Sequence, residues 1–262
     1  MVRVHFMRLI ESKSLYFSLL IGLLITTGQY VFVSLDVRSF TQGVIPKSSY
    51  LTWLGANGFD QITTIFLFIL PILAALPYGA QLQSDIHYGY YELSSSKISK
   101  RKYLSSIYIV NAIAGFLAII IPVMFNFFLH SLTYKAIVPN PMLYYGYVPE
   151  QNTTLSNYLF FNHPFINTLM YIVLFGLVGS AMAMLSLSSG FFTKKKLIIF
   201  SIPFAFQLIL FILPTDISLN PMEFLPSVST RTVQFEGVIG FFLGILFLCS
   251  IFIYLGKRRN EI

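Results

Sequence analysis

Charge and cysteine are both scarce in this sequence. Only 10% of the 262 residues are Asp, Glu, Lys or Arg, whereas an ordinary soluble domain carries roughly 25%. The single cysteine, Cys249, lies in an apolar run and excludes both an internal disulfide and a cysteine-based metal site. Apolar residues make up 56% of the chain, and the mean hydropathy is +0.74. These values indicate an integral membrane protein with no separate soluble domain beyond its loops.

The motifs of several enzyme classes are also missing. The phosphate-binding loop G-x-x-x-x-G-K-[ST] does not occur, so the chain does not bind nucleotide by that route. The zinc-protease motif H-E-x-x-H is absent as well. Serines are present in the apolar segments, for example at 186–189, but no base stands near them to activate a nucleophile. We therefore expect no catalytic residue, cofactor or metal on this chain.

Six apolar segments are long enough to cross a bilayer. They cover about 15–35, 61–80, 105–129, 165–189, 197–213 and 235–256. The first run ends without a small-x-small cleavage site, so we expect it to remain as an anchor. The segments predict an all-α membrane protein in which residues 1–262 form one transmembrane domain of six helices.

The distribution of basic residues predicts the orientation. The N-terminal segment, the stretch 81–104, the turn 194–196 and the tail 257–259 hold 13 of the 17 Lys and Arg residues. Since cytoplasmic loops are enriched in Lys and Arg, both termini are expected in the cytoplasm. The net charge of +7 then follows from this sorting and does not indicate nucleic-acid binding.

Two segments on the expected cytoplasmic side have helical character. Residues 1–14 mix Arg3, Arg8 and Lys13 with apolar side chains and predict an amphipathic helix lying on the membrane surface. The stretch 81–104 is polar and basic, and each of its cations would cost roughly 2.5 to 3.5 kcal/mol at the centre of a membrane helix. Its apolar residues Ile86, Tyr90 and Leu93 are spaced to form one stripe on a short helix.

The loops on the opposite side are different in kind. Residues 130–164 are rich in tyrosine and proline, which is typical of an aromatic belt at the membrane surface or of a surface that guides an amphipathic substrate. The loop 214–234 contains three prolines and is expected to include a short re-entrant or interfacial helix.

The apolar segments contain four isolated amides and almost no charge. The amides are Gln29, Asn111, Asn126 and Gln207. Such groups either bond neighbouring helices together or line a path for a substrate. Ion-coupled carriers usually keep a titratable residue at membrane depth, and only Glu236, near the start of the last segment, is acidic here.

The stretch 81–104 carries a resemblance to a known family. It contains Asp85, then Gly89 and Glu92, then the basic turn Ser99-Lys100-Arg101-Lys102-Tyr103 leading into the third apolar segment. This order, with six spans and an interfacial N-terminal helix, resembles the membrane subunits of ABC transporters of the ABC-2 permease type. The run at 94–97 is Ser-Ser-Ser-Lys where that family usually has apolar residues.

The resemblance implies a permease of the plasma membrane that moves a hydrophobic or amphipathic substrate, such as a peptide, lipid or drug, outward. ATP and Mg²⁺ would bind a separate cytoplasmic subunit, and a second permease, identical or not, would complete the pore. Membrane lipids are the remaining expected partners. The residues implied to couple to the ATP-binding subunit are Asp85, Gly89, Glu92, Ser99, Lys100, Arg101 and Tyr103, with Arg8 from the N-terminal helix.

Two alternatives remain from the residues alone. A membrane enzyme or sensor would act without transport and predicts a buried catalytic pair among the spans. An ion-coupled secondary carrier predicts a titratable group in the middle of the membrane together with internal pseudo-symmetry.

Overall fold

The computed structural model describes residues 1–35, 46–56, 60–144, 148–150, 152–213, 218–229 and 231–260. Within these ranges the chain folds into α-helices and contains no β-strand element. The helices are α1 (Val2–Ile10), α2 (Lys13–Leu35), α3 (Ser49–Thr52), α4 (Gln61–Ala75), α5 (Gln81–His87), α6 (Tyr90–Lys97), α7 (Lys100–Thr133), α8 (Asn157–Asn162), α9 (Pro164–Ser189), α10 (Lys196–Ile212), α11 (Pro221–Phe224) and α12 (Phe235–Asn260).

Among the described residues, four helices are long and apolar enough to cross a membrane: α2, α7, α9 and α12. The other two predicted spans correspond to α4 and α10, which are apolar but shorter, with 15 and 17 residues. The all-helical architecture is thus confirmed for the described residues. The predicted segment 61–80 ends earlier as a helix, at Ala75, because Pro77 follows and cannot donate a main-chain hydrogen bond.

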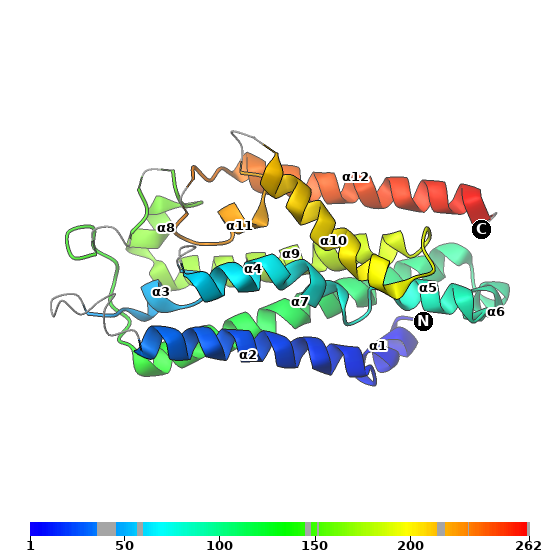
Figure 1. The fold of residues 1–262 in the computed structure, drawn as a ribbon, viewed down its shortest axis with the longest axis horizontal. Helices are drawn as coiled ribbons and strands as arrows, with labels where there is room; N and C mark the ends of the chain where they lie inside the picture. The colour runs from blue at the N-terminus through cyan, green and yellow to red at the C-terminus, as the bar shows by residue number, and fades with distance from the viewer. Residues whose placement is uncertain are drawn as a thin grey trace.

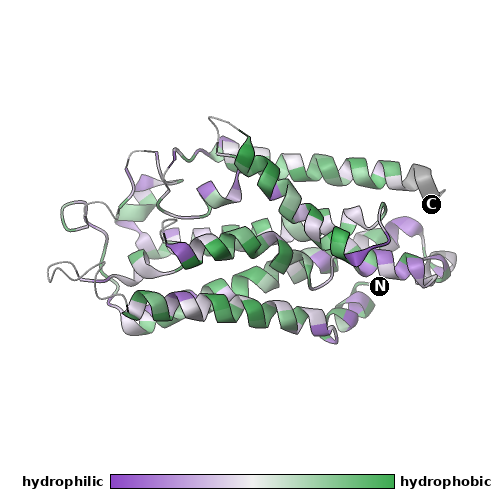
Figure 2. Ribbon diagram, viewed as in Figure 1, coloured by the Kyte–Doolittle hydropathy of each residue, from purple (hydrophilic) through white to green (hydrophobic). Residues whose placement is uncertain are grey.

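Helix α9 is at the centre of the bundle (Figure 1). In its most apolar stretch 61% of the residues are buried, compared with 22% in α2 and in α12. It packs against α4, α7, α10 and α12. Tyr171, Phe175 and Met182 on α9 are fully buried in the main core. Apolar residues predominate along the middle of the long helices and polar residues toward the ends (Figure 2), which is the pattern that a bilayer requires.

The α7–α9 contact is close because small residues face each other. A Cβ atom at Gly115 of α7 would lie 2.5 Å from Cβ of Ala183 and 2.7 Å from the carbonyl oxygen of Gly179, both on α9. Any larger side chain at Gly115 or Gly179 would force the two helices apart. The small residues Gly179 and Ala183 thus permit close approach of α7 to α9. On α12, by contrast, a Cβ at Gly244 would meet nothing within 4 Å.

Pro71 in α4 and Pro203 in α10 each leave one carbonyl group without its normal donor, and a neighbouring helix supplies a replacement. Pro71 in α4 has no N–H to donate to the carbonyl of Leu67, four residues earlier. Nε2 of Gln207 in α10 donates to that oxygen at 2.9 Å. A membrane interior offers no water as a substitute, so this bond both satisfies α4 and attaches α10 to it.

The same arrangement occurs at Pro203 in α10. Its missing N–H frees the carbonyl of Ile199, which accepts a hydrogen bond of 3.1 Å from Oγ of Ser186 in α9. A third case involves Pro77, the freed carbonyl of Leu73 and Oγ of Ser18 in α2, at 2.7 Å. Three polar side chains in the spans, Ser18, Ser186 and Gln207, are therefore matched to prolines in, or just after, adjacent helices.

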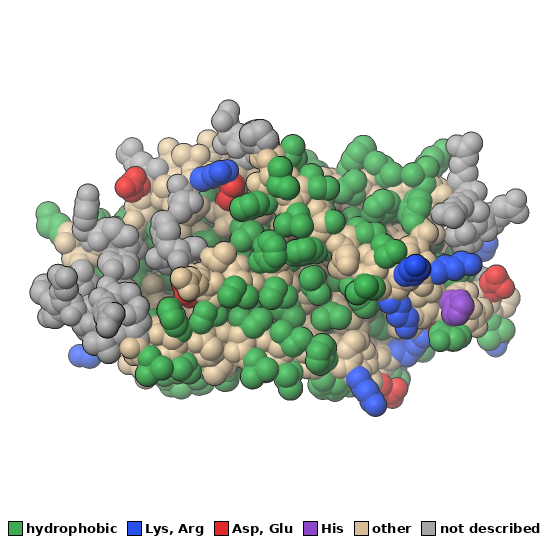
Figure 3. Space-filling model, viewed as in Figure 1, with side chains coloured by type: hydrophobic (Ala, Val, Ile, Leu, Met, Phe, Trp, Pro, Cys, Tyr) green, Lys and Arg blue, Asp and Glu red, His purple; other side chains and the backbone are tan. Residues whose placement is uncertain are grey.

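The two ends of the bundle differ. Helices α1, α5 and α6, the α9–α10 turn and the chain's two termini lie at one end, and α3, α8 and α11 lie at the other (Figure 1). On the face shown in Figure 3, Lys and Arg side chains gather at the end that carries the N terminus. At the opposite end, Tyr144 is fully buried in a small separate core and Tyr158 is exposed. The short helix expected within 214–234 is α11.

We predict that the proline-matched hydrogen bonds contribute measurably to stability. Ser186→Ala should lower the free energy of unfolding by about 1 kcal/mol, because the Ile199 carbonyl loses its donor in an apolar surrounding. In a Pro203→Ala background the same change should have little effect, since residue 203 can then donate to that carbonyl. The measurement is unfolding of the purified chain in detergent micelles by SDS titration.

Ser201→Ala is the matched control, because the Ser201 hydroxyl bonds only to the carbonyl of Leu197 on its own helix and is exposed. Equal losses for Ser186→Ala with and without Pro203 would contradict the proposed matching.

Candidate functional site

The predicted coupling stretch folds into two short helices, α5 and α6, joined at Gly89. We call residues 81–97 the elbow. Gly89 has a φ of +70°, in the left-handed region that favours glycine, and a Cβ there would meet nothing within 4 Å. The expected single apolar stripe of Ile86, Tyr90 and Leu93 is wrong, because the turn at Gly89 breaks the helical register and leaves Leu93 62% exposed.

Asp85 holds the elbow to the rest of the chain. Its residue exposure is only 2%, and its carboxylate accepts hydrogen bonds from three directions. Arg8 of α1 donates to it from both terminal guanidinium nitrogens, Nη2 to Oδ1 at 2.7 Å and Nη1 to Oδ2 at 3.2 Å. Gln81 donates to Oδ1 at 2.9 Å, and the Tyr103 hydroxyl of α7 donates to Oδ2. Because a buried charge needs compensation, these donors fix three segments of the chain to one another.

Arg8 is held from two sides. Besides its bonds to the carboxylate, its guanidinium carbon lies 4.7 Å from the centre of the Tyr90 ring, a cation–π contact. Burial by itself favours the neutral form of Arg8, but the hydrogen bond and negative charge of Asp85 outweigh this effect and raise the pKa of the guanidinium. The side chain of Arg8 remains 33% exposed. The ion pair is therefore half-buried and accessible at one edge.

His5 lies one turn before Arg8 on α1 and is fully buried. Its Nδ1 is 3.0 Å from the hydroxyl of Tyr78, and its ring meets that of Tyr103 edge-on with 5.2 Å between ring centres. Burial lowers the pKa of His5 from 6.5 to about 4; the nearby Asp85 carboxylate opposes this shift, whereas the Arg8 guanidinium reinforces it. The imidazole is thus neutral at pH 7 and packs as part of the core.

We call His5, Arg8, Tyr78, Asp85 and Tyr103 the Asp85 cluster. Its members come from α1, the turn after α4, the elbow and the first turn of α7. The charge of Asp85 is balanced by Arg8. The hydrogen bonds of the cluster tie α1, the elbow and the first turn of α7 to one another.

Five of the eight sequence-predicted coupling residues lie outside this cluster. Glu92 on α6 and the turn residues Ser99, Lys100 and Arg101 are exposed. Gly89 takes part only through its backbone conformation. The structure therefore separates the predicted set into a buried group that fixes geometry, Arg8, Asp85 and Tyr103, and an exposed group that faces outward.

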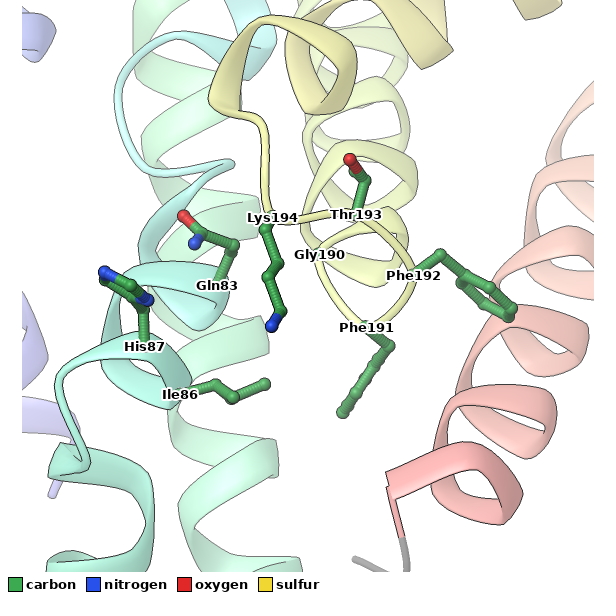
Figure 4. Close-up of a pocket in the computed structure, with 8 residues that line it drawn as sticks. All are labelled: Gln83, Ile86, His87, Gly190, Phe191, Phe192, Thr193 and Lys194. Carbon is green, nitrogen blue, oxygen red and sulfur yellow. The ribbon is translucent and has the colours of Figure 1, made fainter.

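A hollow of about 560 Å³ lies between α5 and the α9–α10 turn (Figure 4). Gln83, Ile86 and His87 line it from the elbow, and residues 190–194 line it from the turn. Oε1 of Gln83 is buried and has no hydrogen-bond partner among the described residues. The Lys194 side chain extends across the hollow from the turn toward α5 in Figure 4. We call this space the elbow hollow.

The amides of the apolar segments mostly join helices. Nδ2 of Asn126 in α7 donates to Oε1 of Gln29 in α2 at 2.8 Å, and Oδ1 of Asn126 accepts the main-chain N–H of Leu54 at 2.8 Å. Nε2 of His130 lies 3.1 Å from the same Gln29 oxygen. Gln207 holds α4, as described above. Asn111 is fully buried, and both polar atoms of its side chain have no partner among the described residues.

No group of His, Cys, Asp or Glu within the described ranges is placed to hold a metal ion. Comparison of the chain with protein-family models, with curated proteins and with solved structures finds no match. The site therefore has to be interpreted from its own geometry.

Sequence reasoning missed His5, Tyr78, Gln81 and the contribution of residues 190–194. One signal was available for His5, since it precedes Leu9 by four residues and both are buried on the same face of α1. The α9–α10 turn carried no local signal, because its place beside the elbow depends on how α9 packs.

We predict that Arg8→Gln destabilises the chain by about 2 kcal/mol, because Asp85 keeps its burial but loses its only ion-pair partner within the described chain. Arg3→Gln, an exposed cation on the same helix, is the control and should change stability by less than about 0.5 kcal/mol. SDS titration of the purified proteins measures both values. Equal effects of the two substitutions would show that the pair does not fasten α1.

We also predict a pH effect from His5. Its pKa is near 4 when folded and 6.5 at its ordinary value, so the unfolded chain binds a proton in this window and the native chain does not. Stability should therefore fall as the pH drops from about 6.5 to about 4. His5→Gln removes this titration, so its loss of stability between pH 7 and pH 5 should be smaller than that of the wild type. Identical losses for the two proteins would refute the assignment.

Proposed function

We propose that this chain is the membrane subunit of an ATP-driven exporter of the ABC-2 permease type. Its partner would be a cytoplasmic ATP-binding subunit, since no phosphate-binding loop occurs in this sequence. The observation that carries the proposal is the Asp85 cluster. It includes Asp85 and Tyr103 of the motif on which the resemblance rests, and it joins Arg8 of the N-terminal helix to both.

The proposal includes six spans with both termini in the cytoplasm. The shorter helices α4 and α10 pack against α9 and against each other, and their prolines are matched by donors on neighbouring helices. With 15 residues, α4 is about 22 Å long and needs the adjoining turn 76–80 to complete its crossing. The gathering of basic residues at one end (Figure 3) supports a cytoplasmic location for that end.

The elbow is suited to receive force from a partner. A subunit that hydrolyses ATP can act on the spans only through an element that does not deform when pushed. The Asp85 carboxylate links the elbow directly to α1 and to the base of the 34-residue helix α7. A displacement of the elbow would therefore be transmitted along α7, which contacts α2, α4 and α9.

The proposed contact surface for the ATP-binding subunit is the elbow hollow with the exposed side of α6. The hollow lies between the elbow and the α9–α10 turn, so one inserted segment of a partner would touch both.

The apolar outer surfaces of the spans and the near absence of charge within them are compatible with a hydrophobic or amphipathic cargo.

The test is affinity purification of the tagged chain from its native membrane in mild detergent, followed by mass spectrometry and an ATPase assay in nanodiscs. The expected result is a stoichiometric partner containing G-x-x-x-x-G-K-[ST] and ATP hydrolysis by the complex. A chain that purifies without such a partner would overturn the proposal.

We predict that Gly89→Val lowers ATPase activity of this complex at least fivefold, because a β-branched residue at a φ of +70° costs about 1 to 2 kcal/mol and straightens the elbow. Gly89→Asn is the matched control, since asparagine tolerates the left-handed conformation. Its activity should stay within about twofold of the wild type. Because a Cβ at this position meets no other atom, both substitutions test the backbone angle rather than steric fit. Equal activities of the two variants would show that the backbone conformation at Gly89 has no effect on ATP hydrolysis by the complex.

A further inference from the structure

A second hollow, of about 510 Å³, lies where α6 and the start of α7 approach the last part of α12. Tyr91 of α6, the face of α7 that carries Lys100, Arg101, Leu104, Ser105 and Tyr108, and Ile253 of α12 line it. We call it the α7 hollow. Its size falls within the range of about 300 to 1,000 Å³ that small-molecule sites occupy.

The α7 hollow is polar at one end and apolar at the other. Lys100 and Arg101 stand in the first turn of α7, and Leu104 and Tyr108 follow one and two turns further along. Arg101 and Tyr108 are about 10 Å apart along the helix axis, at a rise of 1.5 Å per residue. The hydroxyl of Tyr108 is already bonded to Ser188 of α9 at 2.8 Å, so Tyr108 presents mainly its ring to the hollow.

Three features of the polar end favour a negatively charged group. Two cationic side chains line it. The N-cap residue Ser99 makes no side-chain hydrogen bond to the first turn of α7, which leaves the positive end of this long helix without a capping oxygen. Tyr91 also lines the hollow. It is only 3% exposed, and its hydroxyl is buried and has no hydrogen-bond partner among the described residues, which leaves one donor unused.

Because the hollow lies beside two membrane-spanning helices, it suits a lipid better than a segment of protein. Both α7 and α12 are long and apolar enough to span a membrane, so a space between them adjoins the acyl chains. Lys100 and Arg101 cannot enter the hydrocarbon and must lie at the level of the headgroups. The polar end of the hollow is thus at headgroup depth, and Leu104, Tyr108 and Ile253 lie beside the acyl chains.

We propose that the α7 hollow binds one anionic glycerophospholipid. Lys100 and Arg101 contact its phosphate, and the Tyr91 hydroxyl donates to the headgroup. An acyl chain occupies the apolar part beside Ile253. The lipid would add a further connection between the elbow and α12, where Ile253 already packs against the buried cluster that includes Tyr91. The family resemblance implied that Lys100 and Arg101 face the ATP-binding subunit; the lining of this hollow assigns them to the lipid instead.

The test uses the purified full chain in detergent, titrated with phosphatidylglycerol or with phosphatidylcholine of the same acyl chains, with bound lipid counted by native mass spectrometry. The wild type should bind phosphatidylglycerol at least about tenfold more tightly than phosphatidylcholine. The double variant Lys100→Gln/Arg101→Gln should weaken phosphatidylglycerol binding about 25-fold, at roughly fivefold per cation. Its affinity for phosphatidylcholine should change by less than twofold.

Lys195→Gln/Lys196→Gln is the matched control, because these two exposed cations lie at the same end of the bundle and do not line the α7 hollow. It should leave phosphatidylglycerol binding within twofold. Tyr91→Phe keeps the ring and removes the unpartnered hydroxyl, and should weaken phosphatidylglycerol binding about fivefold without changing helix content by circular dichroism.

Equal binding of the two lipids by the wild type, or equal losses in the two double variants, would overturn the lipid site. If Lys100→Gln/Arg101→Gln released the ATP-binding subunit and left lipid binding unchanged, these cations would belong to a protein contact and the proposal would fail. Lipid binding is measured on the chain alone, so its outcome is separate from that of the proposed transport function.

Discussion

The carboxylate of Asp85 is buried, and a buried negative charge is stable only where donors surround it. Arg8, Gln81 and Tyr103 supply these donors from α1, α5 and α7. The position of the N-terminal helix, the angle of the elbow and the start of the longest helix therefore depend on one another. The electrostatic requirement of one side chain organises this end of the bundle.

A related constraint acts within the spans, where the groups concerned are uncharged. A proline removes one main-chain donor, and the carbonyl that it leaves free has no water to bond with inside a membrane. Gln207 and Ser186 meet this need from adjacent helices. Polar residues in an apolar helix are often taken as signs of a substrate path. Here two of them are explained by prolines on a neighbouring helix, and Asn111 is the buried amide whose polar atoms have no partner in the described chain.

Much of the secondary structure could be predicted from composition and periodicity. Each apolar run became a helix, because a long run without charge has few other ways to satisfy its main chain in lipid. The ends of the helices could be predicted less closely. Helix α7 runs from Lys100 to Thr133, beyond the predicted 105–129, because a helix can continue into polar residues whose side chains reach the headgroups. The elbow was predicted as one apolar stripe, and Gly89 broke it into two helices.

Residue type and spacing are enough to establish that the chain is helical and apolar, which segments carry the basic residues, and that Asp85, Gly89 and Tyr103 lie in a polar stretch between apolar runs. These are local properties, set by side-chain type and spacing. The packing of the helices was needed to show that Arg8 reaches Asp85, that His5 contacts Tyr78 and Tyr103, and that the α9–α10 turn faces the elbow. Contacts of this kind join residues about 70 to 100 positions apart, so they depend on how whole helices pack, and no local pattern records them.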